Sequence, residues 1–421
     1  MNERSMLLGG AQSDFARNWS REGKGLVEVL QEVVPAALDA AGIDRDELGR
    51  LRDAGRLGIF VGNFDGQQYC RQGHAGALLS EVDEVFVGVP GARYEAACAS
   101  GSVALEAAST KLRCDDLDLA LVVGVEVMRS VPPKEIGDYL ATCALYEHEA
   151  RGVDFLFPHM FGELADHVIE RSGQPEARIM GAFDAIARLN HANGKRNPNA
   201  QARRFDLDSE AFARREAEFA PHLGGRTRFR DCSQITDGGA AMLVAREDYA
   251  RAHARRTGRP LARLSGWGHR EAPIRFDTKI EASRRGEGLL PWTQRTIADA
   301  YARAGVGPEQ IDVIELHDCF TVSEFLQLSA FGLCEPGGEV ELIEEGAIAP
   351  GGRCPVNPSG GLLAAGHPVG ATGVRMALDL YRQVTDQAGD TQVPDARRGA
   401  MLNIGGSFTT NVSFVVEQAE A

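Results

Sequence analysis

The chain has 421 residues, of which 43% are hydrophobic and 25% charged, as in an ordinary globular protein. It contains no run of about 18 apolar residues, so we expect no segment inserted in a membrane. Its formal net charge of -15 argues against nucleic acid as a partner, and an anionic ligand would need a local basic patch such as Lys195-Arg196 with Arg203-Arg204.

The two ends of the chain carry no targeting pattern. The first eight residues, Met1-Asn-Glu-Arg-Ser-Met-Leu-Leu, resemble neither a secretory signal nor an organelle presequence. The final Glu-Gln-Ala-Glu-Ala is not the simple peroxisomal tripeptide. The eight cysteines form no CxxC pair, which fits a reducing compartment. We therefore expect a cytoplasmic protein.

The predicted elements occur twice along the chain. In the first half a helix and a turn ending near Leu48 lead into a strand at 57–62, and in the second half the same pattern leads into a strand at 312–317. Apolar runs at 119–125 and 241–245 are short and lack alternation, which is typical of strands covered on both faces. Helices are predicted between the strands, for example at 102–112, 292–304 and 374–384. The pattern predicts an α/β protein of two similar halves.

The segment 129–228 has a different character. It contains few buried-strand runs, many His, Pro, Asn and Arg residues, and helical pieces at 162–171 and 182–193. Strand-forming sequence resumes after Asp231, so the segment is an insertion and not a linker between modules. We therefore predict a first half formed by residues 1–128 and 229–258, an inserted loop domain at 129–228, and a second half at 259–421.

Cys98 is the first candidate for chemistry. It lies in Glu95-Ala-Ala-Cys-Ala-Ser-Gly-Ser102, where an extended segment turns into a helix rich in small residues. The free N–H groups and the macrodipole of a helix N-terminus favour a thiolate, so we expect a lowered pKa and a nucleophilic sulfur. The alternative is a small buried thiol that serves only packing.

His367 lies in the glycine-rich stretch Asn357-Pro-Ser-Gly-Gly-Leu-Leu-Ala-Ala-Gly-His-Pro-Val-Gly-Ala-Thr-Gly373, which runs into a helix. Gly366 and Gly370 permit tight turning and close approach of the backbone to a ligand. An imidazole held there would take the thiol proton from Cys98.

His317 and Cys319 follow an apolar strand, at the edge where α/β proteins commonly present catalytic groups. Their spacing of two would place both on one face of an extended strand, so that they address the same substrate. For Cys319 a packing role remains open. Together with Cys98 and His367, this pair predicts a Cys/His acyl-transfer site.

Two glycine pairs complete the pattern. Asn403-Ile-Gly-Gly-Ser407 ends a predicted strand, and its glycines would expose backbone N–H groups to a developing oxyanion. Asp237-Gly-Gly is more simply a tight turn, so we assign no chemistry to Asp237.

These motifs resemble those of the thiolases, and in particular the sterol-carrier-protein-type thiolases. The resemblance covers nearly the whole chain: the motif around Cys98, Asn190-His-Ala-Asn-Gly-Lys-Arg-Asn-Pro198, His317-Asp-Cys-Phe320, Gly332-Leu-Cys334 and the stretch around His367. It implies a five-layered αβαβα core of two similar halves with an inserted loop domain, usually assembled as a homodimer.

The resemblance also implies a role for each residue. Cys98 would attack the thioester carbonyl of an acyl-CoA or 3-ketoacyl-CoA, and His367 would activate it. His317 would line an oxyanion hole with His367, and Cys319 would move a proton on the α-carbon of the nucleophilic acyl-CoA. The N–H groups of Cys98 and Gly405 would form a second oxyanion hole.

The ligands follow from the same resemblance. His159-Met160 resembles a loop that lies along the pantetheine arm of CoA. CoA would be substrate and product, with no permanently bound cofactor. We also expect no metal, because the ten histidines include no HxxxH pair.

Three functions are compatible with the residues. The first is a 3-ketoacyl-CoA or acetoacetyl-CoA thiolase of lipid metabolism, working by thiolysis or by the reverse Claisen condensation. The second is a specialised biosynthetic acyltransferase or condensing enzyme, with a small accessory protein that delivers acyl groups. The third is a non-catalytic acyl-CoA-binding scaffold. Acyl specificity is expected largely in residues 130–228.

Overall fold

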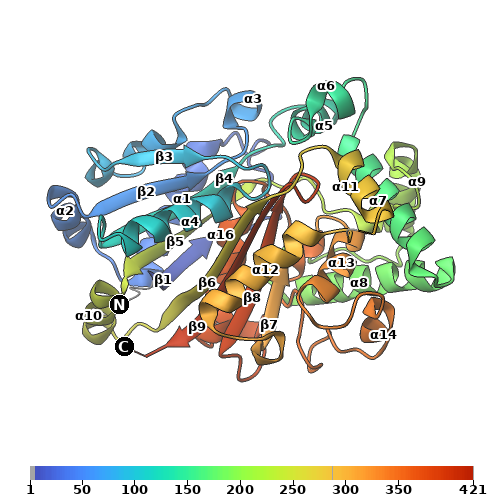
Figure 1. Cartoon of the computed structure of the whole chain (residues 1–421). Coiled ribbons are helices and arrows are strands. Elements are labelled where there is room, and N and C mark those ends of the chain that lie inside the picture. Colours follow the sequence, from blue (N-terminus) through green and yellow to red (C-terminus); the bar gives the residue numbers. More distant parts are fainter. Residues whose placement is uncertain (1–4, 287, 421) are drawn as a thin grey trace.

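Nine strands form one sheet in the computed structural model, which describes residues 5–286 and 288–420 (Figure 1). In sheet order they are β3 (Gly91–Tyr94), β2 (Leu57–Gly62), β4 (Leu119–Glu126), β5 (Gly238–Arg246), β1 (Ser5–Gln12), β6 (Leu261–Glu271), β9 (Thr410–Ala419), β8 (Arg398–Gly405) and β7 (Val313–Leu316).

The sheet consists of two half-sheets that share the pairing of four strands, and the first half has β3 in addition, parallel to β2. In the first, β2 runs parallel to β4, and β4, β5 and β1 then pair antiparallel. In the second, β7 runs parallel to β8, and β8, β9 and β6 pair antiparallel in the same succession. The halves join where three residues of β1, Ser5 to Leu7, pair with β6. The predicted repeat is confirmed, with β2 and β7 in equivalent places.

Helices of the two halves flank these strands. In the first half they are α1 (Leu26–Ala41), α2 (Arg45–Asp53), α3 (Gly66–Cys70), α4 (Ser100–Arg113) and α10 (Glu247–Thr257). In the second half they are α11 (Phe276–Arg284), α12 (Pro291–Ala304), α13 (Thr321–Ala330), α14 (Glu339–Glu344), α15 (Gly361–Ala365) and α16 (Thr372–Val384). Each helix in this described part of the chain is too short or too polar to cross a lipid bilayer.

The elements stack in five layers. The helices α4 and α16 pack on each other, α4 against β2 and β4, and α16 against β7, β8 and β9. On the outer faces, α1 covers β1 and β5, and α12 covers β6 and β9. The expected αβαβα architecture is therefore present. It explains why β4 shows no alternation, since Leu121 and Val122 point to opposite faces and both are fully buried.

The chain between β4 and β5 forms the helices α5 (Pro133–Ala141), α6 (Tyr146–Glu149), α7 (Leu156–Ser172), α8 (Glu176–Arg196) and α9 (Glu210–Phe219). Because Glu126 at the end of β4 pairs with Gly238 at the start of β5, this excursion leaves and rejoins the sheet at the same end of two neighbouring strands. The green helices in Figure 1 lie beyond that end. The exact limits of the inserted domain stay a prediction.

Candidate active site

The turn that carries Cys98 is held in an uncommon conformation. Ala97 has a φ of 52°, in the left-handed region that costs a non-glycine residue about 1–2 kcal/mol. Its N–H donates to Glu95 Oε1 at 2.6 Å, and its carbonyl accepts from Ser100 Oγ at 2.6 Å. These bonds hold the turn, so Cys98 stands directly before α4 and remains partly accessible.

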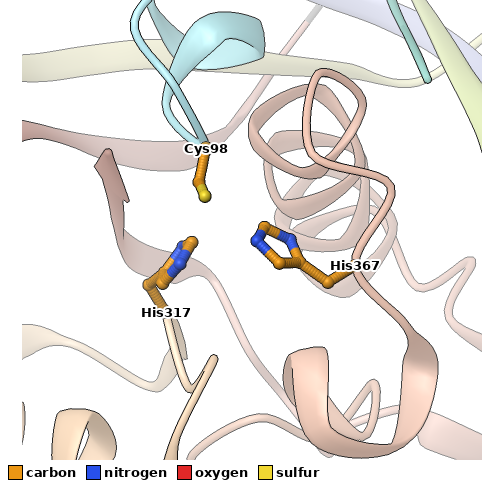
Figure 2. A group of neighbouring side chains, drawn as sticks. All are labelled: Cys98, His317 and His367. Atoms are coloured by element: carbon orange, nitrogen blue, oxygen red, sulfur yellow. The ribbon is translucent and has the colours of Figure 1, made fainter. Parts of the chain in front are cut away.

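Three predicted side chains meet at one point. The sulfur of Cys98 and ring nitrogens of His317 and His367 all lie within 4.8 Å of one another. Figure 2 shows the three side chains pointing toward one another. The two imidazole rings are 5.1 Å apart, centre to centre, and almost perpendicular at 89°. Cys98 comes from the turn before α4, His317 directly follows β7, and His367 comes from the turn before α16. The five-layered packing therefore brings the predicted cluster together.

The hydrogen bonds around His367 indicate which ring nitrogen carries its proton. Thr372 Oγ1 lies 3.0 Å from the Pro368 carbonyl and 2.7 Å from His367 Nδ1, and we infer that it donates its single hydrogen to the carbonyl and accepts from Nδ1–H. The other nitrogen of His367, Nε2, then bears a lone pair and has no protein partner. His367 is therefore set up as a base beside the Cys98 thiol.

His317 has the opposite tautomer. Asn403 Nδ2 donates to His317 Nδ1 at 2.9 Å and to the Cys98 carbonyl at 3.1 Å, while Asn403 Oδ1 accepts from Ser102 Oγ at 2.8 Å. This network fixes the orientation of the Asn403 amide and makes Nδ1 an acceptor. The proton of neutral His317 is consequently on Nε2, where it can donate to an oxyanion.

Burial decides the protonation states of the cluster. It raises the pKa of Cys98 to about 12, although the Cys98 and Gly406 N–H groups that face the sulfur oppose part of this rise. Burial, with a smaller effect of the Arg375 charge, lowers the pKa of His367 to about 3, and it lowers the pKa of His317 far below its usual value. The expected low thiol pKa is wrong, because desolvation outweighs the helix N-terminus. The resting site holds a thiol and two neutral imidazoles.

Cys319 lies beside this group but outside the 4.8 Å cluster. It is buried, with 9% of its surface exposed, and its sulfur is 3.7 Å from Ser323 Oγ. Burial raises its pKa well above the usual value, and a negative charge on Cys98 would raise it further. The two thiols are thus close enough for a charge on one to raise the pKa of the other, but they occupy separate positions. This arrangement suits two separate tasks.

The turn between β8 and β9 supplies a backbone amide to the site. The N–H that faces the Cys98 sulfur belongs to Gly406, one residue beyond the predicted Gly405. Gly405 itself ends β8, and its carbonyl accepts from Thr409 N–H at 3.0 Å. Its role in an oxyanion hole stays a prediction. Gly406 belongs to the glycine pair that the sequence indicated, but the role was assigned to Gly405 alone.

Buried carboxylates shape the loop that carries His367. Asp318 accepts from Leu362 N–H at 2.6 Å, and Glu126 accepts from Gly370 N–H at 3.1 Å. A Cβ at Gly370 would lie 2.8 Å from both Glu126 and the Gly62 carbonyl, so only glycine fits there. The sequence analysis assigned neither carboxylate a role, although Asp318 lies in the quoted motif His317-Asp-Cys-Phe320. The signal for Glu126 was its position at the end of an apolar strand.

Several expectations for the ligand-binding residues change. His159 and Met160 lie in the helix α7 and not in a loop, with His159 exposed and Met160 buried in the main core. A contact of either with CoA stays a prediction. The basic patch suggested for an anionic ligand consists of Lys195, Arg196, Arg203 and Arg204. Arg203 is paired with Asp14 at 2.7 Å, and Arg196 donates to the Asp390 carbonyl at 3.3 Å, so two of these four side chains already have protein partners.

Asp237 is also different from expectation. It is fully buried and accepts from the N–H groups of Met128 and Arg129, both at 2.8 Å. It therefore anchors the chain leaving β4 and does not form a tight turn.

The cluster of Cys98, His317 and His367 offers one sulfur and two nitrogens, a donor set that also suits Zn²⁺. The same atoms would be needed free for acyl transfer, so a bound zinc ion would compete with that chemistry. The absence of a functional metal stays a prediction.

Comparisons with known proteins agree along the chain. The thiolase N-terminal domain family matches residues 8–248, and the family described as thiolase C-terminal domain-like matches residues 280–418. An acetyl-CoA acetyltransferase of Methanothermobacter thermautotrophicus is 29% identical over 413 residues, which cover 96% of this chain and 97% of that protein. Human sterol carrier protein 2 is 29% identical over 76% of this chain and 57% of its own length.

A solved structure shares the fold. It is named Ltp2-ChsH2(DUF35) aldolase, and it superimposes with a TM-score of 0.73 over 99% of this chain and 98% of that chain, at 19% identity. The family matches, the repeated five-layered architecture and the Cys98 cluster lead to one conclusion. The chain belongs to the thiolase family.

Proposed function

We propose that the protein is a thiolase-type acyltransferase that works through an acyl group on Cys98. One observation carries the proposal: a thiol, a basic Nε2 on His367 and a donating Nε2–H on His317 meet in one cluster. The acetyl-CoA acetyltransferase relatives over the full chain support it. The reaction is CoA-dependent cleavage of a 3-ketoacyl-CoA or the reverse Claisen condensation.

In the cleavage direction, His367 Nε2 takes the Cys98 proton as the sulfur attacks the 3-keto carbon. The amides around Cys98 and Gly405–Gly406 stabilise the negative oxygen that forms. The bond between the α-carbon and the keto carbon then breaks, which leaves an acyl-Cys98 thioester and an enolate of acetyl-CoA. The His317 Nε2–H stabilises this enolate, and Cys319 protonates its carbon.

In the second half of the reaction the acetyl-CoA leaves and a CoA thiol enters. The proton that His367 took from Cys98 passes to the Cys319 thiolate, which restores the neutral imidazole and the Cys319 thiol. His367 then removes the CoA proton, the CoA sulfur attacks the acyl-Cys98 carbonyl, and the departing Cys98 sulfur takes this proton back from His367 as the new acyl-CoA forms. CoA enters as a substrate and leaves as part of the thioester products, so the reaction needs no resident cofactor. Two thiols are required because one holds the acyl group while the other moves the α-proton.

A second candidate is a biosynthetic condensing enzyme that works with a small accessory protein. The observation in its favour is the structural relative, whose name includes a DUF35 protein. A homodimer in the cytoplasm, acting in lipid metabolism, is part of both proposals. The retained Cys98 favours acyl transfer over aldol chemistry in each case.

The test is incubation with acetoacetyl-CoA and CoA, and with longer 3-ketoacyl-CoAs, while mass spectrometry follows the acyl group on Cys98. Loss of the 3-ketoacyl thioester with a transient Cys98 adduct is the expected result. An adduct without cleavage would favour the condensing enzyme, and neither would favour a binding scaffold. Cys98→Ala should abolish the adduct, and the exposed Cys114→Ala is the matched control.

A further inference from the structure

A cavity of about 390 Å³ lies among α11, the start of α12 and the turn between β8 and β9. Its volume is within the roughly 300–1,000 Å³ of small-molecule sites. Most of its walls are apolar, formed by Ala272, Pro273, Ala282, Leu289, Leu290, Pro291, Trp292 and Phe408. None of these residues belongs to the 129–228 insertion, where specificity was expected.

Lys279 contributes a hydrocarbon surface to this cavity. Only 8% of the residue is exposed, and its amino group donates to the Ser407 carbonyl at 2.6 Å, Ser407 Oγ at 3.0 Å and Thr409 Oγ1 at 2.9 Å. Its three donor positions are therefore used by the turn, and the methylene stem is what remains for a ligand. Two arginines, Arg285 and Arg295, also line the cavity, but both are exposed and Arg295 lies over the Trp292 ring, so the buried walls suit a hydrocarbon.

The turn that Lys279 holds is shared with the active site. Gly406 presents its N–H to the Cys98 sulfur, and Phe408, two residues later, lines the cavity. Two Cα steps span at most about 7.6 Å. Phe408 also lies 6.1 Å from Phe161, which stacks at 4.3 Å on Phe320, the neighbour of Cys319. One wall of the cavity, formed by Phe408, therefore lies within the length of a medium-chain acyl group held on Cys98.

We propose that this cavity receives the distal part of the acyl group, so that the substrate is a CoA thioester with a hydrocarbon acyl group longer than acetoacetyl. The assignment rests on the proposed thiolase function. It places the chain-length determinant on α11 and α12 of the second half. Each additional methylene that is buried in the cavity then strengthens the binding of long substrates relative to short ones.

The decisive variant is Ala282→Phe, which places a ring in the cavity from α11. For this variant and the wild type, kcat/KM is measured with 3-ketodecanoyl-CoA and with acetoacetyl-CoA. The ratio of the two values should fall about tenfold or more, while turnover of acetoacetyl-CoA is retained. Ala298→Phe, on the exposed face of α12, is the matched control and should keep the wild-type ratio. An unchanged ratio, or equal losses with both substrates, would overturn the assignment.

Binding separates this assignment from the proposed function. Calorimetry on the Cys98→Ala protein should show tighter binding of decanoyl-CoA than of acetyl-CoA, and the additional Ala282→Phe change should remove the difference. If the wild type cleaves neither ketoacyl thioester but the binding difference is found, the thiolase proposal fails and the cavity assignment stands. If cleavage occurs and both thioesters bind equally, the cavity assignment fails alone.

Discussion

The Thr372→Val variant tests how the site makes His367 a base. Thr372 is fully buried, and its hydroxyl is the acceptor for His367 Nδ1–H at 2.7 Å. Valine keeps the shape and removes this acceptor. The Pro368 carbonyl, which also accepts from the Thr372 hydroxyl, keeps the backbone N–H of Thr372 at 3.0 Å and that of Ala371 at 2.9 Å. The substitution therefore leaves only the Nδ1–H of the His367 imidazole without a partner.

The magnitude follows from the unpaired Nδ1–H. A buried donor without a partner costs about 1–3 kcal/mol, which favours the tautomer with its proton on Nε2 and removes the base. At about 1.4 kcal/mol per factor of ten, kcat should fall by roughly 5- to 150-fold.

The assay is thiolysis of acetoacetyl-CoA at saturating substrate, with the rate of Cys98 acylation followed by rapid-quench mass spectrometry. KM should change little, because Thr372 lies behind the imidazole. Thr372→Ser keeps the hydroxyl and is the matched control, with nearly full activity. Wild-type kcat in Thr372→Val, or equal losses in both variants, would refute the assigned tautomer.

Three further outcomes follow from the same site. Since burial raises the pKa of Cys98 to about 12, its alkylation by iodoacetamide should accelerate about tenfold per pH unit from pH 7 to 9, and a plateau in this range would contradict the pKa. Asn403→Ala removes the donor to His317 Nδ1 and should lower kcat about 10- to 100-fold, whereas activity within twofold of wild type would deny that role. Cys319→Ala should still take an acetyl group from acetyl-CoA onto Cys98 but lose exchange of the acetyl protons with D₂O. Persistent exchange would assign the proton transfer to another group.

Much of the fold could be predicted because its signals are local. A strand covered on both faces must be apolar throughout, and β4 was recognised by its uninterrupted run from Leu119. The repeat was visible because both halves place a helix and a turn before an equivalent strand, β2 and β7. His159 and Met160 were expected in a loop because they resemble a loop of the thiolases, whereas they lie inside the helix α7.

The candidate site was predictable only in its residue types. Glycines beside His367 and small residues after Cys98 indicate a turn before a helix, because few other side chains allow such close approach. Which backbone amide faces the sulfur depends on how β8 and β9 turn into each other, so Gly406 could not be told from Gly405. The cavity beside Phe408 depends on three separate segments and had no sequence signal at all.

The sequence by itself determined the α/β class and the two halves, and it predicted the Cys98, His317, Cys319 and His367 set from spacing and residue chemistry. Only the tertiary structure decided the protonation states. They depend on Thr372 and Asn403, which packing brings against the imidazoles, and on the removal of water from all of these groups. Desolvation acts through the whole surrounding volume, so a local motif that favours a thiolate is overruled by burial.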